Sequence, residues 1–311
     1  MGIVRLSVGG GTPEGMNSAY LVDGRVLVDP GPPTDGAWEE LRSGLESRLE
    51  RLTDLEYVVC THWHADHVGL APRLADAAGA TIAIGAGDAP LLGEYGSERE
   101  RRLERDANAM RVWGVPAKTI ASVTDGDRPS PVPVRCDVSP LEAGDELAGA
   151  TVLETPGHTA GHIALEMGTD HALMVGDAVL PTYTPNVGGS DTRLRGTDPL
   201  GTYLETLDRI ESREGVDDGS VALLPGHGST CSSNRLETIR DHHRERTVRV
   251  REALGKLGSS TPWDVAIHLF GSLEGIHTKF GAGEAAAHLE YLERESVVAR
   301  DSDGTYWLVE S

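Results

Sequence analysis

Short runs of apolar, β-branched residues recur along the chain, and several of them end abruptly at a polar loop. This pattern predicts buried strands, and the runs are residues 57–60, 150–155, 163–166, 172–175 and 221–224. Apolar residues spaced three and four apart predict helices, over residues 38–52, 70–78, 88–113 and 199–213. Because the two kinds of segment alternate, the sequence predicts an α/β fold.

The first thirty residues have a different pattern, in which strand-like segments are separated by turn residues. Asp23-Gly24 predicts a hairpin between residues 19–22 and 25–28. The glycines at positions 9–11 predict a break in the first strand. Further along, the prolines and β-branched residues of 121–140 predict irregular edge strands.

The last part of the chain predicts three helices followed by a hairpin. The helices are expected over residues 235–257, 262–270 and 283–295, and the hairpin strands over 297–300 and 305–309. This order is typical of a winged helix. We therefore predict two domains, one of residues 1–234 and a small winged-helix-like domain of residues 235–311.

Side chains that can bind a metal follow the predicted strand 57–60. His62, His64, Asp66 and His67 lie within six residues. Neutral imidazoles packed so closely would each need a hydrogen-bond partner, and protonated ones would repel each other. A metal ion resolves both problems, because zinc and related ions bind imidazole nitrogen and carboxylate oxygen.

Three more candidate ligands each follow an apolar strand. His158, Asp177 and His227 come after residues 150–155, 172–175 and 221–224, and loops at strand ends often carry functional residues. His162 is expected to support the ligands rather than to bind metal. The other histidines lack this context and are expected on the surface or in the core: His171, His242, His243, His268, His277 and His288.

The order His62-x-His64-x-Asp66-His67 after a strand resembles the metal-binding motif of the metallo-β-lactamase superfamily. The resemblance implies an αββα sandwich with two metal positions. It assigns His62, His64 and His158 to the first position, and Asp66, His67 and His227 to the second. Asp177 would bridge the two, and Asp29 of the Asp-x-Gly element would support the metal loop.

Two divalent ions about 3.5–4 Å apart can share a water molecule and lower its pKa, so hydrolysis by a bridging hydroxide is the expected chemistry. Asp66 would also orient the hydroxide and accept a proton. Histidine and carboxylate donors suit Zn²⁺, and they suit iron and manganese as well. We expect two divalent ions, with zinc as the first choice.

The resemblance leaves the substrate open. Glyoxalase II-like members suggest a small-molecule ester or thioester (a hydroxyacylglutathione-hydrolase-like activity), whereas lactamase-β-like endoribonucleases with a C-terminal winged helix suggest single-stranded RNA. A DNA-binding winged-helix regulator and a mononuclear iron persulfide dioxygenase are further alternatives. Tyr183, Arg193 and Arg195 are candidate substrate contacts, because arginine binds carboxylate and phosphate; an ordinary solvated loop is the alternative.

The amino-acid composition limits the classes of molecule that the protein is expected to bind. The chain has 49 acidic and 28 basic residues, a net charge of −21, and such a surface repels polyanions. The predicted helix 283–295 carries four glutamates and one arginine, which argues against binding duplex DNA. We hypothesise a salt-adapted cytoplasm, with a GC-rich genome as the alternative explanation.

No apolar run is long enough to span a membrane, and the N-terminus lacks the apolar core of a signal peptide. A cytoplasmic protein is therefore expected, and a homodimer is possible. The three cysteines have no CxxC spacing, so neither a disulfide framework nor a cysteine zinc site is expected.

Overall fold

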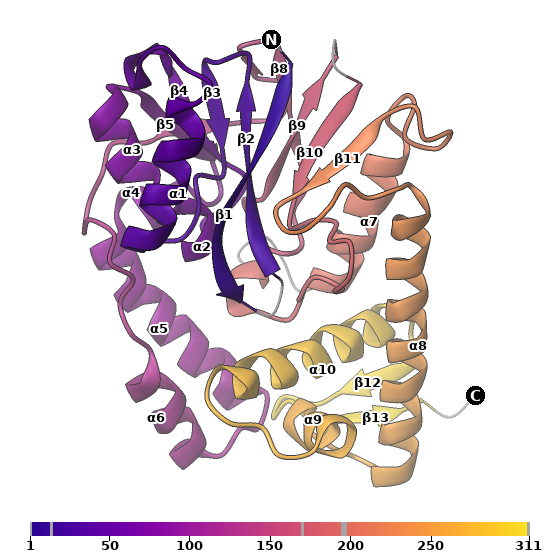
Figure 1. Cartoon of the computed structure of the whole chain (residues 1–311). Coiled ribbons are helices and arrows are strands. Elements are labelled where there is room, and N and C mark those ends of the chain that lie inside the picture. The colour runs from indigo at the N-terminus through magenta and orange to yellow at the C-terminus, as the bar shows by residue number, and fades with distance from the viewer. Residues whose placement is uncertain (1, 13–14, 169–170, 194–197, 310–311) are drawn as a thin grey trace. The chain divides into compact units, whose positions relative to one another are not determined.

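The computed structural model describes residues 2–12, 15–168, 171–193 and 198–309 (Figure 1). The chain forms two compact units, each assembled from separate stretches of sequence. The first unit contains Met1–Glu98, Ser130–Pro185 and Thr206–Leu236, and the second contains Arg99–Pro129, Asn186–Glu205 and Glu237–Ser311. The division into domains at residue 234 stays a prediction.

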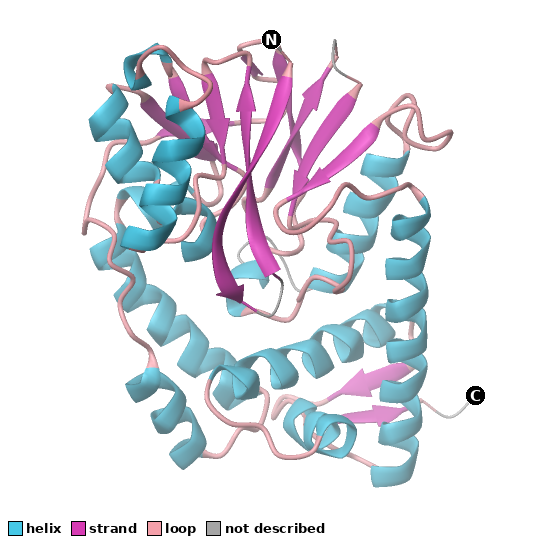
Figure 2. Cartoon of the chain, viewed as in Figure 1, coloured by secondary structure: helices cyan, strands magenta, loops and turns pink. Residues whose placement is uncertain are grey.

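Two β-sheets form the centre of the first unit (Figure 2). The six-stranded sheet has the order β1-β2-β3-β4-β5-β6: Ile3–Thr12, Gly15–Val22, Val26–Val28, Tyr57–Cys60, Thr81–Gly85 and Ser139–Leu141. The five-stranded sheet has the order β11-β10-β9-β8-β7: Ala222–Pro225, Ala172–Gly176, Ile163–Met167, Ala150–Glu154 and Glu146–Leu147.

Strand β4 shows how side-chain alternation builds the layers. Val58 and Cys60 pack in one core cluster with Leu41 of α1 (Asp35–Glu46) and Leu74 of α3 (Ala71–Ala78). Val59 points to the opposite face and joins a cluster that includes residues of both sheets. The two sheets therefore pack face to face, with helices on the outer face of the first, as the predicted αββα sandwich requires.

Strand direction decides where the functional loops gather. Strands β3, β4 and β5 are parallel neighbours, so their carboxyl ends meet at the same edge of the first sheet. Strands β10 and β11 are parallel in the second sheet, and β8 runs in the same direction because both β8 and β10 are antiparallel to β9. Each sheet thus has one edge at which several polar loops emerge together.

The glycines near the N-terminus do not end the first strand, so that prediction was wrong. Strand β1 continues through them to Thr12, and its register against β2 shifts between Val8 and Thr12. Gly9 has φ +65°, and a Cβ there would lie 2.6 Å from Cγ of Pro32. The glycines therefore allow a bulge within a continuing strand, which a break signal alone does not distinguish.

Most of the other predicted elements are present. The hairpin at Asp23-Gly24 joins β2 to β3. The segment expected as edge strands is different: α6 (Ala117–Gly126) is a helix, and only β6 follows as a short strand. Ile120 of α6 packs with Met110 and Trp113. Packing of this helical face overrides the strand propensity of the β-branched residues.

The remaining helices lie between or after these strands. They are α2 (Ala65–Val68), α4 (Ala89–Gly93), α5 (Tyr95–Val112), α7 (Pro199–Glu211), α8 (Asn234–Leu257), α9 (Pro262–Phe270) and α10 (Ile276–Arg294), with 3-10 turns at Leu52–Asp54 and Ser190–Arg193. None of the helices in the described part of the chain combines the length and apolar character that a membrane crossing requires.

The C-terminal elements agree closely with the sequence pattern, except that α10 begins before residue 283. Thr261 and Asp264 form a capping box around Pro262, which explains why the start of α9 was predictable. Strands β12 (Val298–Arg300) and β13 (Tyr306–Leu308) form a separate two-stranded sheet.

Two histidines are buried in the second unit. His243 and His288 are 2% and 0% exposed, and their ring centroids lie 5.5 Å apart. Nδ1 of His288 lies 2.8 Å from Oγ1 of Thr247, whereas both nitrogens of His243 and Nε2 of His288 have no hydrogen-bond partner among the described residues. Burial lowers the pKa of His243 to about 3 and holds the pKa of His288 well below its usual value.

This burial predicts a loss of stability in mild acid. The unfolded chain binds a proton on each of these imidazoles below a pH of about 6.5, whereas the folded chain does not until much lower pH. The stability present above that pH is therefore lost as pH falls toward 3, by up to about 1.4 kcal/mol per pH unit and histidine. Thermal melting from pH 7.5 to 5 should show a shallower pH dependence in His243→Leu than in the wild type. The exposed His268→Leu is the control, and equal slopes in all three proteins would contradict the prediction.

Candidate metal centre

The loop after β4 turns directly into the one-turn helix α2. His64 occupies the N-cap position, and its carbonyl accepts hydrogen bonds from the backbone N–H groups of His67 and Val68. This turn carries Asp66 and His67 to the edge of the sheet at which His62 emerges from β4. A short apolar strand followed immediately by a helical turn thus brings four polar side chains into one small volume.

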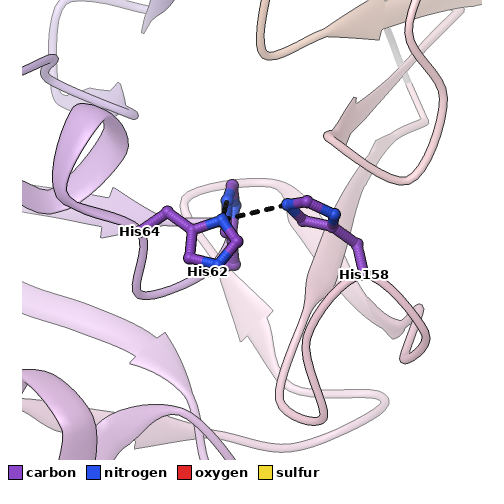
Figure 3. A group of neighbouring side chains, drawn as sticks. All are labelled: His62, His64 and His158. Carbon is purple, nitrogen blue, oxygen red and sulfur yellow. Dashed lines mark hydrogen bonds between the residues drawn. The ribbon is translucent and has the colours of Figure 1, made fainter. Parts of the chain in front are cut away.

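Three imidazoles converge in the first group. Nε2 of His62 and Nε2 of His158 each lie 3.0 Å from Nδ1 of His64 (Figure 3). His158 comes from the loop after β8 in the second sheet, so this group joins the two sheets. Three nitrogens that point toward a common position are the arrangement by which proteins bind a divalent metal ion.

The second group contains one carboxylate and two imidazoles. Nε2 of His227 lies 3.2 Å from Nε2 of His67 and 3.2 Å from Oδ2 of Asp66. Asp66 Oδ2 lies 3.6 Å from His67 Nε2. His227 follows β11, so this group also combines loops from both sheets.

Asp177 lies between the two groups. Its Oδ2 atom is 3.5 Å from Nε2 of His67, 3.6 Å from Nε2 of His227 and 3.9 Å from Nε2 of His158. Its Oδ1 atom is buried and has no hydrogen-bond partner among the described residues. One carboxylate oxygen is therefore within reach of both groups, as a bridging ligand requires.

The structure brings all seven predicted ligands together, and their surroundings fit divalent metal ions. Asp29, at the end of β3, accepts hydrogen bonds from N and Oγ1 of Thr61, each at 2.8 Å, and its Oδ2 lies 3.0 Å from Nδ1 of His67. Nδ1 of His62 lies 3.1 Å from Oγ1 of Thr61. These outer contacts leave Nε2 of both histidines directed at the metal positions. The ligand role of the seven residues stays a prediction.

The carboxylates and imidazoles of the centre shift each other's pKa values. Burial opposes the charge on Asp66 and Asp177, but the adjacent imidazoles, above all His67, outweigh burial and lower the pKa of both carboxyl groups. Burial likewise disfavours a charged His67, yet Asp177 and Asp66 raise its pKa. The two carboxylates are therefore ionised and provide the negative charge that a divalent ion requires.

His162 supports the site, as expected from its sequence position. Its Nδ1 atom lies 2.7 Å from Oγ1 of Thr155, and its Nε2 atom accepts a hydrogen bond from the backbone N–H of Asp177 at 3.1 Å. Burial and the neighbouring His158 lower its pKa, so the ring stays neutral and can accept. Both ring nitrogens are thus engaged, and neither is directed at a metal position.

The sequence did not single out two other buried residues, Asn17 and Asp88. Asn17 lies in β2 and contacts Asp66, whereas Asp88 contacts the loops that carry His64 and His158. Asp88 follows β5 as His62 follows β4, so the same strand-then-polar pattern could have revealed it. No comparable signal marks Asn17, which lies within a strand.

The predicted substrate residues have different environments. Tyr183 is 49% exposed, and its carbonyl accepts a hydrogen bond from Arg235. Arg193 pairs with Glu290 within the second unit, and its guanidinium lies 5.2 Å from the ring centroid of Trp113. Arg195 lies outside the described residues. Their contact with substrate stays a prediction, and the engaged guanidinium of Arg193 favours a structural role for that residue.

The fold and the site together define a class of protein. It is an α/β protein with two stacked sheets and a cluster of histidines and carboxylates on the loops that follow the strands. Comparison with known proteins identifies the family. The Metallo-beta-lactamase superfamily matches residues 12–227. The chain therefore belongs to the metallo-β-lactamase superfamily, and it is a metal-dependent hydrolase.

Individual relatives agree with this assignment. The "Probable metallo-hydrolase YqjP" of Bacillus subtilis is 28% identical over 306 residues, which cover 93% of this chain and 89% of that protein. An "Atrochrysone carboxyl ACP thioesterase" of Aspergillus fumigatus is 27% identical over 277 residues, covering 84% and 70%. The crystal structure of a metallo-beta-lactamase family protein from Thermus thermophilus superposes with a TM-score of 0.78 at 28% identity, covering 99% of each chain.

Gly226 provides a test of how closely the centre is packed. A Cβ at this position would lie 2.3 Å from Oδ1 of Asp177 and 2.6 Å from Cε1 of His67. We expect Gly226→Ala to displace both side chains and to weaken metal binding by about 10–100-fold, as changes around metal ligands do. Equilibrium dialysis followed by elemental analysis measures this. Gly36→Ala, where a Cβ meets nothing within 4 Å, is the control, and unchanged affinity in Gly226→Ala would contradict the prediction.

Proposed function

We propose that the protein hydrolyses a small-molecule ester or thioester at a dinuclear metal centre formed by His62, His64, Asp66, His67, His158, Asp177 and His227. The observation that carries the proposal is the position of Asp177 Oδ2, within 4 Å of imidazoles in both groups. The resemblance to glyoxalase II-like proteins and the similarity to a fungal thioesterase support this substrate class.

Bound divalent ions would supply Lewis acidity and a water molecule with a pKa near neutrality. The chain's own residues hold the ions and handle the proton. Asp66 is suited to accept it, because its side chain is 31% exposed whereas His67 and His227 are 0% and 2% exposed. Its lowered pKa keeps the carboxylate ionised, so it can accept hydrogen bonds from the attacking water molecule and orient it.

We propose zinc as the metal, because the donors are imidazole and carboxylate groups without thiolate. Iron and manganese use the same donors, so metal analysis of the purified protein is the decisive measurement. A single iron per chain, together with oxygen uptake in the presence of a persulfide, would replace the hydrolase with the dioxygenase alternative.

We further propose that α8, α9, α10 and the β12–β13 hairpin form a winged-helix-like module that does not read duplex DNA. Two of the basic residues of α8 are already neutralised: Arg244 pairs with Glu237 and Asp241, and Arg246 pairs with Glu284. These two arginines are therefore less available to phosphates, on which nucleic-acid binding depends. Sequence-specific duplex binding in a salt titration would refute this assignment, and it would favour the regulator alternative.

The substrate class can be tested with two probes, a generic thioester and a single-stranded RNA, at high salt. We expect turnover of the thioester only. Asp177→Asn should lower kcat/KM by about 100-fold or more, because the shared ligand is lost and the activation of water by the metal ions depends on it. Asp76→Asn, which changes an exposed carboxylate on α3, is the control. RNA cleavage that is lost in Asp177→Asn would instead assign the protein to the nucleases.

The surface charge leads to a separate proposal, adaptation to high salt. A net charge of −21 destabilises the folded chain by self-repulsion, and salt screens this repulsion. We expect the melting temperature to fall as the KCl concentration is lowered from about 2 M to 20 mM, because charges on the surface are strongly screened at the higher concentration and weakly screened at the lower one. Full thermal stability at millimolar salt would refute the proposal. Sucrose at matched osmolality controls for osmotic effects.

A further inference from the structure

Two buried polar residues outside the ligand set contact the two ligand groups separately. Asp88 is 0% exposed, and Asn17 is 1% exposed. Asp88 contacts the loops of the three-histidine group, and Asn17 contacts the group of Asp66 and His227. Both lie in the first unit, as do all seven predicted ligands.

Asp88 fastens two loops to each other. Its Oδ2 atom accepts hydrogen bonds from the backbone N–H of Trp63 at 3.1 Å and from Oγ1 of Thr159 at 2.7 Å. Its Oδ1 atom accepts from the backbone N–H of Gly161 at 2.8 Å. Trp63 lies between His62 and His64, and Thr159 directly follows His158. One carboxylate therefore fixes the spacing of the loops that carry all three imidazoles of the first group.

The chemistry of these contacts requires a carboxylate. Three donors converge on Asp88, and an ionised carboxylate offers acceptor sites on both oxygens. An asparagine of nearly the same shape would direct an NH₂ group at a donor and leave that donor unsatisfied, which is costly in a buried site. Asp88→Asn therefore disturbs the loop contacts with little change in volume.

Asn17 contacts the second group in two ways. Its Nδ2 atom donates to Oδ2 of Asp66 at 3.4 Å, and this is the oxygen that lies 3.2 Å from Nε2 of His227. Its backbone forms an isolated antiparallel bridge with His227, and the next residue, Ser18, donates its backbone N–H to the carbonyl of Gly226 at 2.8 Å. Strand β2 thus holds one ligand through a side chain and another through its backbone.

The side-chain oxygen of Asn17 can still accept a hydrogen bond. Its Oδ1 atom is buried and has no hydrogen-bond partner among the described residues. A buried, unpaired carbonyl oxygen is costly unless a donor completes it.

We propose that Asp88 and Asn17 are positioning residues that stabilise the two metal positions separately, Asp88 the first and Asn17 the second. This inference rests on the proposed dinuclear centre. It implies that the affinity of each position can be weakened without equal loss at the other, because the hydrogen bonds that hold the two groups come from different elements, the loop after β5 and strand β2.

The test measures Co²⁺ binding to the metal-free protein by calorimetry and by visible absorption, which depends on the ligands of the bound ion. In a His64→Ala background, which disables the first position, Asn17→Ala should weaken the remaining ion by about 10–100-fold, whereas Asp88→Asn should change it by less than about threefold. In a His227→Ala background the order should reverse. Asn108→Ala and Asp76→Asn, at exposed positions, are the matched controls.

The outcomes separate this inference from the proposed function. If Asp88→Asn and Asn17→Ala weaken both positions equally in both backgrounds, the two residues support only the general fold and the inference fails, while a wild type that binds two Co²⁺ ions retains the proposed centre. A wild type that binds no more than one ion overturns the dinuclear centre itself. Melting temperatures of all variants, measured without metal, show whether an affinity change reflects loss of folding.

Discussion

The structure depends on the convergence of five imidazoles and two carboxylates at the edges of two stacked sheets. Such groups are costly to bury unless each has a partner, and here several lie within 4 Å of one another. Ionised Asp66 and Asp177 provide negative charge, and the histidine nitrogens provide lone pairs. Divalent cations would satisfy the arrangement, and the strand order of the first unit brings its members together.

Parallel strand direction explains why residues distant in sequence meet there. Asp29, His62 and Asp88 follow three parallel neighbours of the first sheet, and Asp177 and His227 follow two parallel strands of the second. Because carboxyl ends of parallel strands lie at one edge, each loop needs only a few residues to reach the centre. Outer hydrogen bonds that involve Asp29, Asp88 and His162 then fix the loops and orient the predicted ligands.

In the second unit, buried charges form arginine–glutamate pairs instead of a cluster of histidines and carboxylates. Arg193 pairs with Glu290, and Arg246 pairs with Glu284, with all four side chains at most 16% exposed. Buried ion pairs of this kind stabilise only as complete pairs, because removing one partner leaves an unpaired buried charge. These two arginines, which could have been taken for phosphate ligands, are therefore paired inside this unit.

The strands and helices with strong local patterns were predictable from the amino-acid sequence, and so were the positions of the candidate ligands. The run before His62 and the capping box at Thr261 are examples, because alternation, capping and turn chemistry act over a few neighbouring residues. The sequence did not determine the continuation of β1 through Gly9 or the helix at 117–126, since a bulge depends on the partner strand and α6 depends on packing of Ile120 against Met110. Folding in three dimensions places Asp177 between the two groups, occupies both ring nitrogens of His162, and brings Asn17 and Asp88 into contact with the centre. Those facts are contacts between segments far apart in the sequence, such as Asp88 and Gly161 with a separation of 73 residues, and no local pattern encodes them.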